Sequence, residues 1–224
     1  MASYKLNIGR IKGCPPALKV QELLEKFGVP EKDEYGVLNH NATEEAVTAA
    51  IVRRTNQTYQ RLDPQTKEVT SQQVEKVTVY PFTIVPRKEA LEVYAGSAKS
   101  IEEIGLFLST CLGLAVVAEG IELDVCDAID KLTKATQRFQ IRSVRVSDFA
   151  HNSYMIGPYS PKFQDSEHGK DFMQEYAEAI VSASVRFQGP HGKVTVGLSP
   201  KAAFSFSCNE EDPSAVKSIL RTLA

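Results

Sequence analysis

The chain has 224 residues, of which 42% are hydrophobic and 24% charged, and its 26 basic and 28 acidic side chains leave a formal net charge of −2. This composition excludes widespread disorder, because enough apolar side chains are present to bury a core. It also excludes a globally basic nucleic-acid-binding protein, although a local basic patch remains open.

The spacing of apolar residues in the first half of the chain predicts strands with two helices among them. The expected elements are a strand at residues 4–11, a helix at 17–27, a short strand at 35–38, long strands at 47–63 and 69–85, a third strand at 90–95 and a helix at 100–111. The two long strands are joined by a turn-rich connector, so we expect a hairpin that the third strand extends into a meander.

The second half repeats this alternation of helices and strands. The expected elements are a helix at residues 122–136, a strand at 139–146, a mobile loop at 148–169, a helix at 170–180, strands at 182–187, 193–198 and 203–208, and a last helix that begins after Asp212. A strong turn at residues 189–192 separates two of the strands.

Both halves share the order helix, three-strand meander, helix, and residues 88–95 align with residues 201–208. We therefore predict an α+β fold of two similar lobes, each a three-stranded antiparallel meander packed on helices. The N-terminal lobe would cover residues 1–112 and the C-terminal lobe residues 113–224, within one continuous globular unit. The competing interpretation is that any strand, turn and helix in succession produces such a pattern.

The outer part of the first hairpin, residues 53–75, is almost wholly polar. A polar two-stranded ribbon has no face to bury, so we expect it to project from the body.

The chain carries none of the familiar phosphate-binding, nucleophile-elbow or metalloprotease motifs. Its cysteines, Cys14, Cys111, Cys126 and Cys208, lack metal-ligand spacing, so we expect no metal, no cofactor and no disulfide framework. Reduced cysteines suit the cytoplasm, and the absence of a signal peptide and of a long apolar stretch predicts no membrane association.

The clearest binding candidate is the basic part of the hairpin, because two-stranded ribbons can enter a nucleic-acid groove. The competing interpretation is an exposed hairpin whose charges keep it soluble and block edge pairing. A second basic cluster lies near the strand at residues 139–146. The candidate binding residues are Arg53, Arg54, Tyr59, Arg61, Lys67, Arg138 and Arg142.

One cluster in the expected loop is a candidate catalytic site, since the Asp148 carboxylate could orient the His151 imidazole as a general base. The sequence places no nucleophile beside them. We therefore predict a non-catalytic binding or assembly protein, a subunit of a larger complex or a homo-oligomer, with a protein partner or a second copy as ligand. The alternatives are a nucleic-acid-binding module that uses the basic hairpin and an enzyme of unfamiliar type centred on Asp148 and His151.

Overall fold

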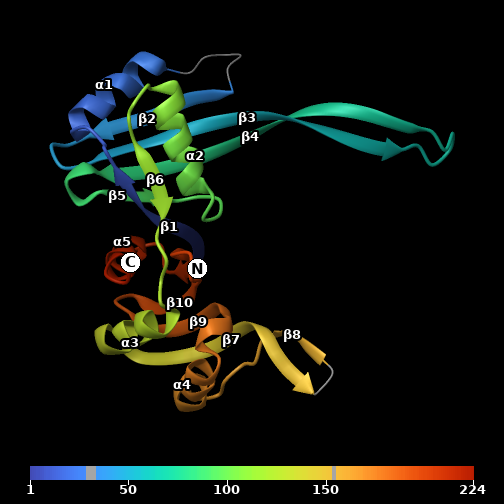
Figure 1. Cartoon of the computed structure of the whole chain (residues 1–224), viewed down its shortest axis with the longest axis vertical. Coiled ribbons are helices and arrows are strands. Elements are labelled where there is room, and N and C mark those ends of the chain that lie inside the picture. The colour runs from blue at the N-terminus through green and yellow to red at the C-terminus, as the bar shows by residue number, and fades with distance from the viewer. Residues whose placement is uncertain (29–33, 153–154) are drawn as a thin grey trace. The chain divides into compact units, whose positions relative to one another are not determined.

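The computed structural model describes residues 1–28, 34–152 and 155–224 and shows a mixed α/β fold with a large antiparallel sheet (Figure 1). The strands are β1 (Ala2–Lys12), β2 (Tyr35–Ala42), β3 (Val47–Leu62), β4 (Val69–Val85), β5 (Ala90–Val93), β6 (Val117–Gly120), β7 (Gln137–Asn152), β8 (Met155–Tyr159), β9 (Ile180–Gly189), β10 (Gly192–Leu198) and β11 (Ala203–Cys208). The α-helices are α1 (Ala17–Phe27), α2 (Ser100–Leu106), α3 (Val125–Ala135), α4 (Ser166–Glu175) and α5 (Pro213–Arg221). A π-helical turn, Phe107–Cys111, continues α2.

Hydrogen bonds order the strands as β2-β3-β4-β5-β1-β11-β10-β9-β7-β8, and β6 pairs with β1. Both predicted meanders occur as runs of neighbours, β3-β4-β5 and β9-β10-β11. Each belongs to a larger set of strands than the three expected for a lobe. The similarity of the two lobes therefore stays a prediction, while the α+β class and the antiparallel pairing are confirmed.

Contacts along the chain define two compact units. Unit 1 comprises residues 1–10, 92–102 and 119–224, and unit 2 comprises residues 11–91 and 103–118. The chain passes between them several times, so neither unit is one continuous stretch of sequence. The expected division between residues 112 and 113 falls inside unit 2.

Unit 1 has a helix layer on one face of its strands. Alternate side chains of β9, β10 and β11, including Val185, Val196 and Phe206, are buried and form one core with α3, α4 and α5. Helices α3 and α4 begin where an aspartate side chain accepts hydrogen bonds from their free backbone N–H groups. The Asp124 carboxylate accepts from the backbone N–H of Cys126 and Asp127, and the Asp165 carboxylate caps α4 in the same way.

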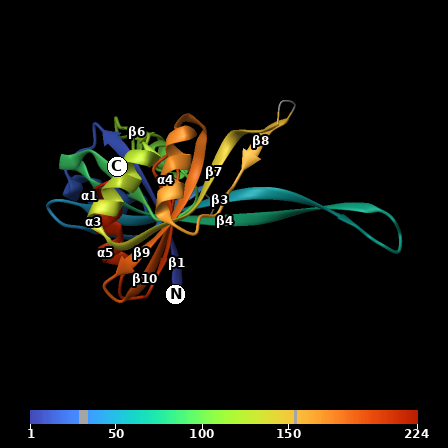
Figure 2. The ribbon, with the colours of Figure 1, turned by 90° about the horizontal axis from the view of Figure 1, so that it is seen from below.

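Unit 2 packs α1 and the α2 region against the inner part of the β3–β4 hairpin. Ile51, Phe82 and Ile84 are fully buried there, with Phe107 of the π-helical turn in the same unit. Helix α1 ends at Gly28, whose φ of 64° is a left-handed conformation that glycine adopts without strain. Beyond this core β3 and β4 continue outward, paired with each other as far as Leu62 and Val69 (Figures 1 and 2).

The predicted mobile loop at residues 148–169 is wrong in its first part. Strand β7 continues to Asn152, β8 pairs with it, and α4 begins at Ser166 instead of residue 170. Gly157 and Pro158 suggested a loop, but β8 is the last strand in the sheet order, and an edge strand tolerates proline because one side of it needs no N–H donor. No helix in the described residues is long and apolar enough to cross a membrane.

Candidate functional site

The projecting part of the hairpin, residues 54–77, is named the ribbon below. The pairing of β3 with β4 runs without a register shift from Val47 and Ile84 to Leu62 and Val69. Outside Arg54, β3 pairs with β4 alone among the described strands. At about 3.3 Å per residue, the nine ribbon residues of β3 reach about 30 Å.

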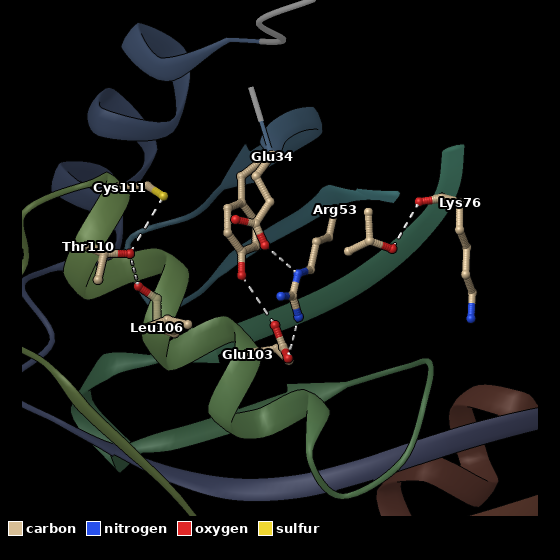
Figure 3. A network of polar contacts seen from close by, with 9 residues as sticks. Glu34, Arg53, Lys76, Glu103, Leu106, Thr110 and Cys111 are labelled. Carbon is tan, nitrogen blue, oxygen red and sulfur yellow. Dashed lines mark hydrogen bonds and ion pairs between the residues drawn. The ribbon is translucent and has the colours of Figure 1, made fainter. Parts of the chain in front are cut away.

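The base of the ribbon holds a network of ion pairs around Arg53 (Figure 3). The Arg53 Nε donates to a Glu34 carboxylate oxygen at 2.8 Å, and its Nη1 donates to Glu103 at 2.6 Å. The Tyr35 hydroxyl donates to the other Glu103 oxygen at 3.2 Å. Arg54, on the opposite face of the strand, lies 3.6 Å from a Glu75 carboxylate oxygen. Both predicted arginines of the ribbon base are therefore paired with carboxylates of their own unit.

This network also sets the ionisation of the groups in it. Burial, reinforced by the negative charge of Glu103, raises the pKa of Tyr35 to about 12. The hydrogen bond to Glu34 raises the pKa of Arg53 further above its ordinary value. A hollow of about 480 Å³ lies beside it, lined by Phe27, Tyr35 and Leu106 together with the Glu34–Arg53 pair. Because Arg53 already serves two carboxylates, it has little capacity left for an anionic ligand.

The tip of the ribbon places the remaining candidates in the open. Arg61 and Tyr59 share a face of the ribbon with Arg53, and the Tyr59 hydroxyl donates to Gln57 at 2.7 Å. Lys67 lies in the closing turn with a φ of 58°, and the turn is held by the Asp63 carboxylate, which accepts from two backbone N–H groups. Asp63 and Glu68 lie beside the two basic residues in sequence, so the tip has no net positive charge.

The expectation of an almost wholly polar ribbon is incomplete. Six large hydrophobic side chains on the ribbon or at its base are 40% exposed or more: Tyr59, Leu62, Val69, Val74, Val77 and Val79. Leu62 and Val69 are directly paired across the tip. Exposed apolar groups gathered on one projecting element are typical of a surface that contacts a macromolecule.

Arg138 and Arg142, in unit 1, lie at irregular positions of β7. The register of β7 against β9 shifts between Gln137 and Gln140 and again between Ile141 and Ser143, so each arginine falls within a shift. Arg138 has a φ of 51°, and Arg142 donates to Gln140 at 3.5 Å. The structure therefore does not bring these two arginines together with those of the ribbon in one described site.

The proposed general base falls outside what the structure describes. The side chain of His151 is not among the described residues, and the exposed Asp148 accepts a hydrogen bond from the Ser147 hydroxyl at 2.5 Å. Within residues 1–28, 34–150 and 155–224, no three His, Cys, Asp or Glu side chains gather as a metal site would require. The enzyme alternative stays a prediction.

A basic surface of unit 1 was not predicted from the sequence. The strand face opposite the helix layer borders a hollow of about 630 Å³ and carries hydroxyl groups on neighbouring strands: Ser143, Ser182, Ser184, Thr195, Ser205 and Ser207. Five basic residues accompany them: Lys5, Arg145, Arg186, Lys193 and Lys201. We name this surface the hydroxyl face. Its signal in the sequence is the alternation of polar and apolar residues, as in Ser182, Ser184 and Arg186 or Lys193 and Thr195, but no strand contributes more than one of the five basic residues.

Comparison with known protein families finds none that matches this chain, and no curated protein matches its sequence.

Proposed function

We propose that this protein is a non-catalytic assembly protein and that the ribbon is the arm by which one copy holds a second copy. The observation that supports this most directly is the set of six exposed hydrophobic side chains on an element whose outer half pairs with no third strand among the described residues. An isolated two-stranded hairpin is marginally stable in water, and burial of these side chains by a neighbour would stabilise it.

Electrostatics favour a protein partner over a nucleic acid at this element. Arg53 and Arg54 are engaged with carboxylates at the base, and Arg61 and Lys67 are offset by Asp63 and Glu68 at the tip. A groove-reading ribbon requires cations that are free to approach phosphates. A second copy is the partner of choice because most soluble oligomers are formed by identical subunits.

The test is the mass of the native protein in solution across a dilution series, measured by light scattering. We expect an oligomer for the wild type and a monomer for a Leu62→Ser, Val69→Ser variant, which removes the apolar pair at the tip. The matched control is Leu18→Ser, Val117→Ser, since these two side chains are also more than half exposed but lie outside the ribbon. It should remain oligomeric.

A wild type that is monomeric at every concentration would overturn the proposal, as would a tip variant with wild-type mass. Circular dichroism of each variant verifies that the loss of assembly is not a loss of folding.

A further inference from the structure

The hydroxyl face is polar because buried apolar side chains and exposed polar side chains alternate along its strands. In β9, Ala183, Val185 and Phe187 are buried in the core, while the residues between them are partly exposed on the other side. β10 and β11 alternate in the same way. All helix residues that join the unit 1 core pack against the buried set. Among the described residues of unit 1, the core helices thus lie on the other side of the strands from the hydroxyl face.

The register brings its small polar residues into rows across the sheet. One row runs from Lys5 on β1 through Ser205, Gly197 and Ser184 to Ser143 on β7. Four strand spacings of about 4.8 Å make such a row about 19 Å wide. A Cβ at Gly197 would lie 2.7 Å from the Ser205 Oγ, so the residues of this row are closely packed. Because the side chains of its serines are small and its glycine has none, these residues rise only a short distance above the backbone of the sheet. A ligand of large cross-section can thus approach the backbone level of the sheet.

The charges on the hydroxyl face all have one sign. Lys5, Arg145, Lys193 and Lys201 are exposed, and within the described residues none of them, nor Arg186, takes part in an ion pair. The Nε of Arg186 is shielded from solvent and has no hydrogen-bond partner among the described atoms. Among the described residues that line the hollow there is no aspartate or glutamate. The face therefore presents uncompensated positive charge and many hydroxyl donors.

This combination suits the phosphate and sugar oxygens of a nucleic-acid backbone, which accept hydrogen bonds from Lys, Arg, Ser and Thr. Single-stranded nucleic acids are usually held by stacking on exposed aromatic rings. The two phenylalanines that border the hollow, Phe204 and Phe206, are 2% exposed and belong to the core. A duplex, which presents only its backbone to a broad surface, fits the face better than a single strand.

We propose that the hydroxyl face of unit 1 binds double-stranded nucleic acid through its phosphate backbone, without base reading. This inference is independent of the assembly role proposed for the ribbon, because the two surfaces share no residue.

The test is a fluorescence-anisotropy titration of the full chain with a DNA duplex, an RNA duplex and an oligo-dT single strand of equal charge, at several salt concentrations. Five phosphate contacts predict a slope of about −4.5 for the logarithm of affinity against the logarithm of salt concentration. Lys5→Ala, Arg145→Ala, Lys193→Ala should weaken duplex binding about tenfold or more and make the slope shallower by about 3. The charge-retaining variant Lys5→Arg, Lys193→Arg should bind like the wild type.

The matched control is Lys131→Ala, Lys134→Ala, Lys170→Ala, which removes the same charge from the helix layer of the same unit. Equal weakening by both triple variants would show an effect of net charge only and would overturn the proposal. So would the absence of duplex binding at low salt, stronger binding of the single strand, or equal competition by polyglutamate. Loss of binding in Arg61→Ala, Lys67→Ala would place the site on the ribbon instead. Thermal melting of each variant separates lost binding from lost folding.

Discussion

The ribbon and the hydroxyl face both carry arginine and lysine, but they differ in whether these side chains are paired with carboxylates. At the ribbon base, Arg53 and Arg54 each lie within ion-pair distance of a carboxylate of their own unit. On the hydroxyl face, Lys5, Arg145 and Lys193 have none in the part of the chain that is described. A basic residue is available to a ligand only when the fold has not already neutralised it, so local basic composition alone does not indicate a binding site.

The largest expected loss of stability follows from removing a basic side chain that is paired with a buried carboxylate. Arg221 makes two hydrogen bonds to the Glu92 carboxylate, whose side chain is 6% exposed, and the Tyr94 hydroxyl also donates to it. Arg221→Ala would leave that carboxylate buried without its counter-ion, so we expect the free energy of unfolding to fall by about 3 kcal/mol. Urea denaturation measures it. Arg145→Ala, on the hydroxyl face, is the matched control and should change stability by less than about 0.5 kcal/mol. Similar losses of stability in both variants would contradict the distinction between basic side chains that are paired with a carboxylate and those that are not.

A smaller loss is expected at the ribbon base. Arg53→Ala removes the partner of two carboxylates that remain partly accessible to water, so we expect a loss of about 1 to 2 kcal/mol. Arg61→Ala removes the same side chain from the same strand face, where no ion pair exists among the described residues, and should be neutral. Thermal and urea unfolding of the two variants and the wild type measures this difference in the free energy of unfolding. An equal effect at both positions would contradict the assignment of Arg53 to the internal network.

Shortening the ribbon should affect folding still less. Asn56 and Glu75 are directly paired, so residues 57–74 can be replaced by the dipeptide Asn-Gly, which forms a two-residue hairpin turn. The removed residues are exposed, with the exception of partly exposed Gln57 and Asp63, and no described core residue lies among them. We expect cooperative melting within about 1 kcal/mol of the wild type, measured on monomeric protein. Loss of cooperativity would show that the ribbon packs on the body.

The smallest expected effect is a pH dependence within unit 1. His191 pairs with the carboxylate of Asp212 at 2.8 Å, and this hydrogen bond raises the pKa of His191 above its ordinary value. Because the folded-state pKa is the higher one, the stabilisation is complete below the unfolded-state pKa of about 6.5 and is lost as the pH rises through the folded-state value. Urea midpoints of wild type and His191→Gln should therefore diverge at acidic pH and converge at alkaline pH. A constant difference across the range would rule out the linkage.

Much of the fold could be predicted from the sequence because the signals are local. The period of two in residues 47–63 and 69–85 placed both hairpin strands within a residue of their ends, and proline and glycine marked both ends of α1. The β7–β8 hairpin was missed for a physical reason. Gly157 and Pro158 indicate a turn by their own preferences, and only the position of β8 at the sheet edge makes a strand acceptable there.

The sequence by itself determined most of the element types and the long β3–β4 hairpin, because these follow from periodicity and turn chemistry. Tertiary structure alone decided which cations are free. Glu103 neutralises Arg53 from 50 residues away, and Lys5 reaches the row of Ser184 only through the pairing of β1, β11, β10 and β9. Ion pairing and cross-strand register depend on distance in space, and residues remote in the sequence carry no local mark of either.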